Sequence, residues 1–433
     1  MACPSRTCLT PILATTATRE EVAAKARELG VVRRSRKVEA YGLLMAVVLG
    51  LSVRGSTVLS RLHRAWCRLT GQRLARSTFW DRLTPPFMQL VKWLLDRLVT
   101  QSRECTFSPP GKLSQFRDVL ALDSSVVQVH KSLRDRWPGT RTHSAPAAIK
   151  VHALVRVFTG ELVDDRLTGE RVADCKAFGV SHRLSRCLVL LDQGYSSPSL
   201  WRRIANVGGY FLTRLPRDRD PRVVADNRPR GGRGRCLTDR PLQQALRGLK
   251  RDLVDVTCTF RCTVRKYRSA KNHRVEETFR VVALRNPKTH RYTLFVTNVS
   301  AKRLPAELVG RAYRLRWEVE LFFKAGKSGL GLHELPTTKP HIVETLVYAA
   351  LIRVSACMQD RVRLLRRTHH PRAPDIGPQR WLDWWRQHVP QLLTALLGPA
   401  EPLSDANRIL LLADPNRKRP TNREVFRFWR EAA

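Results

Sequence analysis

The chain has 433 residues, of which 43% are hydrophobic and 27% are charged, a composition typical of globular proteins. This length predicts two or three domains and a core that needs no disulfides. The charge is unusual, because 78 Lys and Arg residues stand against 37 Asp and Glu residues, for a formal net charge of +41. Such a chain repels itself unless an anionic partner neutralises it, and a nucleic acid backbone fits best. A membrane surface fits less well, since the charge runs along the whole chain, and an arginine-rich proteome is the third explanation.

The cysteines and the N-terminal segment indicate a cytoplasmic protein. The ten cysteines form no CxxC pair, and no histidine has the spacing partner of a zinc site. Residues 1–19 lack a basic stretch followed by an apolar core, so no signal peptide is expected. The longest apolar run, 40–53, is too short to span a bilayer and predicts a buried helix. We therefore expect reduced thiols and no membrane association.

Residues 1–110 are predicted to form a helical domain. Apolar residues recur at spacings of three and four over 19–29, 38–53, 58–69 and 77–100, with Ser77 as the N-cap of the last helix. The middle of this region carries six arginines, namely Arg54, Arg61, Arg64, Arg68, Arg73 and Arg76. Such a module suits recognition of DNA ends, with a helix-turn-helix as one form. Simple packing on the main domain explains the pattern equally well.

From Val119 onward the pattern predicts strands. Alternating or β-branched segments predict strands over 119–130, 149–158 and 161–167, and the apolar run 187–192 predicts a buried central strand. A helix is expected over 198–206 and another strand over 209–215. The order of these elements predicts an α/β catalytic domain that covers residues 111–335.

A β-rich, mostly antiparallel insertion is expected over 216–290. It begins with a turn-rich loop, 216–235, and continues with strands over 254–267 and 275–284. A buried strand over 292–298 and a long helix over 304–328 follow. A helical C-terminal domain is expected over 336–433, with helices at 342–364, 381–397 and 423–430 and a linker at 366–378.

The helix expected over 304–328 is the most informative segment. Its polar stripe consists of Tyr313, Arg316, Glu320 and Lys327. At about 100° per residue, these four positions lie within about 60° of one another. The opposite side, which suits packing on a sheet, carries Leu308, Leu315, Val319 and Phe322. A carboxylate between fixed cations suits a phosphodiester site, but such spacing is also typical of a surface salt bridge.

Two aspartates strengthen the catalytic interpretation. Asp123 lies inside a predicted strand, where a charge is otherwise costly, and Asp192 ends the apolar strand just before a turn. Each could be structural when taken singly. Together with Glu320 they give three carboxylates, which can hold two divalent ions of the Mg²⁺ type around an in-line displacement.

The segment YRLRWEVELFFKAGK, residues 313–327, resembles the Tyr-x2-Arg-x3-Glu-x6-Lys signature of one subgroup of DDE transposases from bacterial insertion sequences. Trp317 and the triplet Phe322, Phe323 and Lys324 also fit that pattern. The segments LDSSVVQVHKSLRDRWPG and LLDQGYSS resemble the blocks around the first and second catalytic aspartates. The resemblance covers residues 115–335.

The resemblance implies an RNase H-like core with a β-rich insertion and helical flanks. It implies that Asp123 is shared by two Mg²⁺ ions, for which Mn²⁺ can substitute, while Asp192 and Glu320 each complete one site. It further implies cleavage at the terminal inverted repeats, a hairpin intermediate and transfer to target DNA by a homodimer in the bacterial cytoplasm, associated with the nucleoid. Tyr313, Arg316, Trp317, Lys327 and, off the main stripe, Lys324 would contact DNA.

One departure concerns base stacking. Members of this subgroup can use a Trp of the insertion to stack on a flipped base, but no Trp occurs between Trp201 and Trp317. Aromatic residues that could substitute are Phe260, Tyr267, Phe279 and Tyr292. Three alternatives stay open: a transposase-derived DNA-binding protein, an RNase H-like nuclease without strand transfer, and a basic structural or RNA-associated protein.

Overall fold

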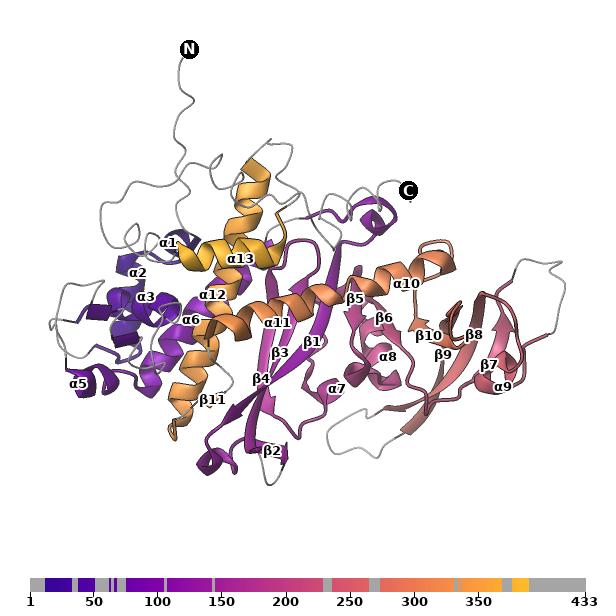
Figure 1. Cartoon of the computed structure of the whole chain (residues 1–433), viewed down its shortest axis with the longest axis horizontal. Helices are drawn as coiled ribbons and strands as arrows, with labels where there is room; N and C mark the ends of the chain where they lie inside the picture. Colours follow the sequence, from indigo (N-terminus) through magenta and orange to yellow (C-terminus); the bar gives the residue numbers. More distant parts are fainter. Residues whose placement is uncertain are drawn as a thin grey trace, which may run out of the picture.

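The computed structural model describes residues 12–32, 38–50, 62–63, 66–67, 75–104, 107–141, 145–228, 236–264, 273–330, 334–335, 337–367 and 376–388. These residues form a mixed α/β fold around one large sheet (Figure 1). Helices from both ends of the chain gather at one side of the sheet, and an antiparallel β region extends its other side (Figure 1).

The centre of the sheet is β1 (Asp118–Val129). On one side it pairs antiparallel with β3 (Ala145–Arg156), which in turn pairs antiparallel with β4 (Leu162–Gly169) and β2 (Pro138–Arg141). On the other side it pairs parallel with β5 (Cys187–Leu191), and β5 pairs parallel with β6 (Tyr210–Arg214). A short strand, β11 (Glu334–Leu335), joins the end of β1. The strands predicted for this part of the sequence lie within four residues of those observed, because their hydrophobic patterns are unambiguous.

The sheet continues beyond β6 as an antiparallel region. Its order is β10 (Tyr292–Thr297), β9 (His273–Arg285), β8 (Leu253–Val264) and β7 (Arg222–Asp226), with the short helix α9 (Leu242–Leu246) beside β7. The prediction of a loop over 216–235 is wrong at β7. The segment is turn-rich, but pairing with β8 satisfies its backbone groups, which its composition could not reveal.

The N-terminal helices are α1 (Ile12–Thr16), α2 (Arg19–Glu28), α3 (Ala40–Gly50), α5 (Arg76–Trp80) and α6 (Pro85–Glu104). Every residue of α3 is buried, as predicted for this apolar run. The prediction of a single helix over 77–100 is wrong, because the helix is interrupted before Pro85. Helical geometry is unfavourable for a residue that precedes proline. Ser77 therefore lies inside α5 instead of capping a longer helix, and most of the helix predicted over 58–69 lies outside the described residues.

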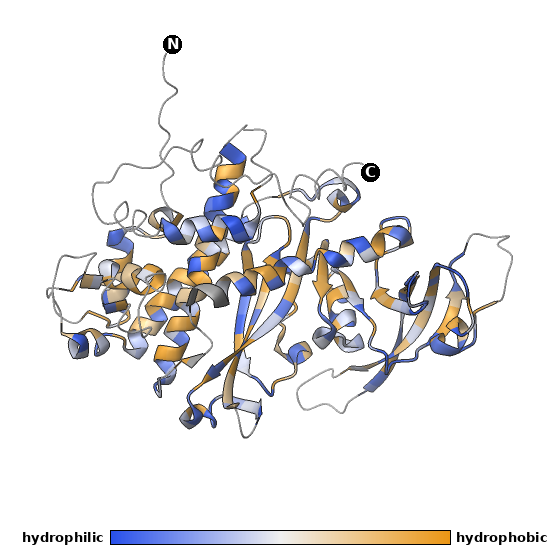
Figure 2. Ribbon diagram, viewed as in Figure 1, coloured by the Kyte–Doolittle hydropathy of each residue, from blue (hydrophilic) through white to orange (hydrophobic). Residues whose placement is uncertain are grey.

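The C-terminal part contains α10 (Ala306–Arg314), α11 (Trp317–Leu330), α12 (Pro340–Arg367) and α13 (Pro378–Gln387). By length and composition α12 could cross a membrane, but 83% of its most apolar stretch is buried inside the protein, so it is a core helix here. In the ribbon of Figure 2, hydrophobic residues of α12 (orange) lie beside those of the N-terminal helices. The contacts agree, since the Gln359 side chain donates to the Leu98 carbonyl. The rest of the helix predicted over 381–397 and the helix at 423–430 lie outside the described residues.

The two faces of the sheet are covered by different helices. Alternate residues of β1, such as Val119 and Ala121, belong to the core formed with α10, α11 and α12, whereas Leu120 and Leu122 belong to the core on the other face. That second face is covered by α7 (Asp174–Ala177) and α8 (Pro198–Asn206). Since side chains alternate along a strand, neighbouring residues of β1 point into different environments.

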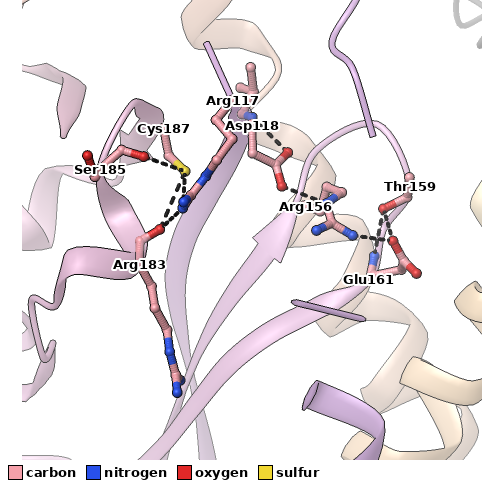
Figure 3. Close-up of polar contacts among 9 residues, drawn as sticks. Arg117, Asp118, Arg156, Thr159, Glu161, Arg183, Ser185 and Cys187 are labelled. Carbon is pink, nitrogen blue, oxygen red and sulfur yellow. Dashed lines mark hydrogen bonds and ion pairs between the residues drawn. The ribbon is translucent and has the colours of Figure 1, made fainter. Parts of the chain in front are cut away.

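Buried ion pairs fix the start of β1 to the β3–β4 hairpin (Figure 3). Arg156 Nε lies 2.6 Å from Asp118 Oδ2, and Arg156 Nη1 lies 2.6 Å from Glu161 Oε2. The Thr159 hydroxyl also donates to Glu161. Burial raises the pKa of Asp118, although Arg156 opposes this. The cluster depends on one guanidinium, which pairs with two carboxylates.

Replacement of Arg156 by Gln is expected to destabilise the protein by about 3–5 kcal/mol, because it leaves two buried carboxylates without their cation. The free energy of unfolding would be measured by urea denaturation. The matched control is Arg261→Gln, which removes an 80%-exposed side chain from a 3.6 Å surface pair, and should change stability by less than about 0.5 kcal/mol. Equal effects of the two substitutions would show that the cluster does not stabilise the fold.

Candidate active site

Three acidic residues and one arginine meet where β1, β5 and α11 come together. Asp123 lies within β1, and Asp192 directly follows β5, whose last residue pairs with the residue before Asp123 in β1. Glu320 lies in the first turn of α11, which crosses the face of the sheet over β1 and β3 (Figure 1). Parallel pairing of β1 and β5 therefore brings two acids together, and α11 adds the third.

Arg316 lies between these carboxylates. Its Nη1 atom is 3.3 Å from Asp123 Oδ2 and 3.5 Å from Asp192 Oδ1, and its Nη2 atom donates a hydrogen bond to Glu320 Oε1. The Arg316 side chain is only 14% exposed. Burial lowers its pKa, but the neighbouring Asp192 and the other partners raise it by more, so that it stays charged. One guanidinium thus contacts three acids that come from distant parts of the sequence and offsets part of their negative charge.

The electrostatics of Asp123 differ from those of an ordinary aspartate. Its pKa rises to about 6, mainly because the side chain is buried and also because Asp192 and Glu320 are negatively charged. The backbone N–H of Ser124 and the Arg316 guanidinium act in the opposite direction but do not cancel the rise. Asp123 is therefore ionised at neutral pH at a cost in free energy.

The prediction of one continuous helix over 304–328 is wrong, because the helix is interrupted between α10 and α11. Backbone hydrogen bonds at this point run to the third residue back, as from the N–H of Arg316 to the carbonyl of Tyr313. The break occurs at Arg316, whose side chain contacts Asp123 of β1. The predicted apolar side is confirmed, since Val319 and Phe322 are buried and Leu308 and Leu315 pack against the same core.

The other residues of the polar stripe differ in their surroundings. Tyr313 is 9% exposed, and its hydroxyl donates to the Leu191 carbonyl at the end of β5, 3.3 Å away. Burial raises its pKa to about 12. Trp317 is 48% exposed at the start of α11, and Lys324 is also exposed. The backbone of Lys327 is part of α11, but its side chain lies outside the described side chains.

The aromatic residues suggested for base stacking are mostly engaged elsewhere. Phe260 and Phe279 are 4% and 5% exposed and pack edge-to-face against Trp201, so their assignment as stacking residues is wrong. Their alternating positions on β8 and β9 face the core, which the sequence did not reveal. Tyr292 donates its hydroxyl to backbone carbonyls in the segment before β8. Tyr267 lies outside the described residues.

The donor atoms of the site suit a hard divalent cation, since all three acids offer carboxylate oxygens. Their oxygens converge on the same guanidinium, which shows that they share one electrostatic environment. Among the residues that the structure describes, however, no three Asp, Glu, His or Cys side chains lie close enough together to hold a single ion as they stand. A cation bound here would compete with Arg316 for the same carboxylate oxygens.

Comparison with known proteins places the chain in a family. Residues 114–354 match the family model described as the transposase DDE domain. The transposase of insertion sequence element IS231D from Bacillus thuringiensis subsp. finitimus is 22% identical over 405 residues, which cover 86% of this chain and 83% of that protein. The transposase of IS231B from B. thuringiensis subsp. berliner is 21% identical over 409 residues, with the same coverage.

Among solved structures, the piggyBac transposase synaptic complex with hairpin DNA has a TM-score of 0.48 and 9% sequence identity, covering 97% of this chain and 88% of that one. The family match spans more than half of the chain. The protein therefore belongs to the DDE transposases, enzymes of DNA transposition, and within them it is of the bacterial insertion-sequence type. The family resemblance inferred from residues 313–327 is confirmed.

Replacement of Asp123 by Asn is expected to stabilise the protein at pH 7.5 in the presence of a chelator, by on the order of 1–3 kcal/mol. The folded protein binds the Asp123 proton more tightly than the unfolded chain does, because the folded pKa is about 6. Stability therefore falls as the pH rises from about 4 to about 6 and stays lower above that range. Asn resembles the protonated acid and avoids this loss.

The measurement is the free energy of unfolding of both proteins at pH 4 and pH 7.5, with the difference expected only at the higher pH. Asp218→Asn, at an exposed position, removes the same charge and is expected to have little effect. A wild-type protein as stable as Asp123→Asn at pH 7.5 would contradict the raised pKa.

Proposed function

We propose that this chain is a cut-and-paste transposase in which Asp123, Asp192 and Glu320 carry out metal-dependent cleavage at the ends of a DNA element and the subsequent strand transfer. The observation that carries the proposal is the convergence of the three carboxylates on Arg316. The structural cluster around Arg156 has two acids for one arginine, whereas this site has three. Three acids around one guanidinium form an excess of negative charge that suits divalent cations.

The topology supports an RNase H-like core for this site. Strands β4, β3 and β1 are successively antiparallel, and β5 and β6 follow on the other side of β1 in parallel. We assign the catalytic domain to residues 111–335 with a β-rich insertion at 216–290, and the helical domains to 1–110 and 336–433. The order of strand, strand and helix that carries the acids is the one expected for this core.

Two divalent ions, Mg²⁺ with Mn²⁺ as an alternative, would supply an activated water and stabilise the leaving oxygen. Asp123 would be shared between them, and Asp192 and Glu320 would each complete one site. Tyr313 holds the end of β5, and hence the start of the Asp192 turn, through its bond to Leu191. Arg316 offsets part of the charge of the acids and would pair with a phosphate.

The DNA contacts of the proposed enzyme lie around the start of α11. Arg316, Tyr313, Lys324 and Lys327 would contact phosphates, and the exposed Trp317 offers an aromatic face for a base if a hairpin forms. The partners would be the terminal inverted repeats and the target DNA, and the net charge of +41 favours both through the phosphate backbone. We further propose that two copies act together on paired ends, in the bacterial cytoplasm and associated with the nucleoid.

The test compares the wild-type protein with Glu320→Gln on labelled DNA that carries the terminal repeats of the element. With Mg²⁺, the wild-type protein should nick and join the DNA, whereas the variant should lose at least a thousandfold in cleavage rate, because one carboxylate ligand is replaced by a neutral amide. Glu318→Gln is the matched control, since it is a neighbouring glutamate of the same helical turn.

The outcomes separate the alternatives. Equal cleavage by wild type and Glu320→Gln would refute the assignment of Glu320. Cleavage without joining would instead favour a nuclease, and sequence-specific binding without cleavage would favour a DNA-binding derivative. Binding that ignores the terminal repeats would favour a basic structural or RNA-associated protein.

A further inference from the structure

A buried polar cluster lies on the face of β1 opposite to Asp123. Its members are Ser124 of β1, Lys150 and His152 of β3, Thr168 of β4, Asp174 of α7 and Tyr195, which ends the turn after Asp192. His152 is 2% exposed and Tyr195 is fully buried. Polar side chains at such positions are costly unless they are hydrogen-bonded, so the cluster needs an explanation.

Two connected sets of contacts make up the cluster. His152 Nδ1 lies 2.6 Å from the Tyr195 hydroxyl, and its Nε2 lies 2.9 Å from the Thr168 hydroxyl. Burial lowers the pKa of His152 to about 4, so the ring is neutral and uses one nitrogen as donor and the other as acceptor. Asp174 Oδ1 accepts from Lys150 Nζ at 3.0 Å and from the Ser124 hydroxyl at 3.2 Å.

Both sets border the short turn η4 (Gln193–Tyr195), which directly follows Asp192. Tyr195 is fixed through its hydroxyl to His152, and its N–H donates to the Asp192 carbonyl at 3.0 Å. Gly194 lies so close to Asp174 that a Cβ atom added to it would be 2.5 Å from Asp174 Oδ2. The turn is thus hydrogen-bonded at Tyr195 and closely packed at Gly194, on the side away from the acids.

The Asp192 side chain does not stabilise the turn η4 that follows it. Within the described part of the chain, it forms no capping hydrogen bond with the turn that it precedes. It is also 37% exposed, more than Asp123 at 17% or Glu320 at 31%. Its carboxylate is therefore available to a cation, but its position must come from the backbone on either side.

From these contacts we propose that His152, Tyr195 and Asp174 are positioning residues that fix the Asp192 carboxylate for divalent-cation binding. The inference rests on the proposed role of Asp192 as a metal ligand. Removal of one anchor should let the turn shift, which weakens cation binding without a change in the acids themselves. Partners that orient metal ligands in this way typically contribute about 10–100-fold in metal affinity or activity.

The test uses Tyr195→Phe in the full-length chain, which keeps the buried ring and removes only the hydroxyl. Mn²⁺ affinity would be measured by electron paramagnetic resonance in the presence of a random-sequence duplex, and duplex affinity separately in a chelator. We expect Mn²⁺ affinity to fall about tenfold, with duplex affinity unchanged within about twofold. Tyr292→Phe is the matched control, because it removes another phenol hydroxyl bonded to backbone carbonyls but remote from Asp192.

A second pair of variants tests the other anchor, and decides the question if Tyr195→Phe does not fold. Gly194→Ala places a methyl group against Asp174 and should also weaken Mn²⁺ binding, whereas Gly179→Ala has open space around its Cβ and should not. Unchanged Mn²⁺ affinity in the folded variants would overturn the positioning role, as would an equal loss in the anchor variants and their controls.

Asp192→Asn separates this inference from the proposed function. If that variant binds Mn²⁺ as the wild type does, the metal role of Asp192 fails and the inference fails with it. If Asp192→Asn loses affinity while Tyr195→Phe and Gly194→Ala do not, only the positioning network is wrong.

Discussion

The contact of Arg316 with three carboxylates is the interaction on which the site depends. Asp123, Asp192 and Glu320 carry like charges at the edge of a buried core, where their mutual repulsion is only weakly screened. A cation must offset that repulsion for the acids to stay together, and in this structure the cation belongs to the chain itself. The site therefore has a defined geometry that is held by the protein.

Strand register makes this arrangement possible. β1 pairs with β5 so that Asp192 follows the residue opposite Leu122, and Asp123 is the next residue of β1. A slip of one residue would turn Asp123 to the other face, away from Arg316. The alternation of side chains along β1 also explains why two neighbouring residues have different surroundings. Asp123 faces α11, whereas Ser124 faces Asp174. The two faces of one strand thus carry the charged site and the contacts that support it.

The sequence predicted those features that depend on local pattern. The continuous apolar run before Asp192 predicted a buried strand, and the signature around Glu320 identified the family. The predictions from sequence failed where a distant partner determines the structure. β7 is ordered by its pairing with β8. At the helix break, the Arg316 side chain contacts another element. The role suggested for Phe260 failed for the same reason, since its burial depends on Trp201. His152 and Asp174 gave no signal, because their contacts join five separate elements, β1, β3, β4, α7 and η4.

On the proposed function, Arg316 and a divalent cation would neutralise the same oxygens. Arg316 is tethered to α11 and cannot leave the site, so a cation that takes over the carboxylates would leave its guanidinium without enough negative charge nearby. A DNA phosphate supplies that charge, and a guanidinium binds phosphate as well as it binds carboxylate. Cation and DNA would then each favour the binding of the other, because both are needed to balance the charges. Until both arrive, Arg316 would offset part of the negative charge of the three acids.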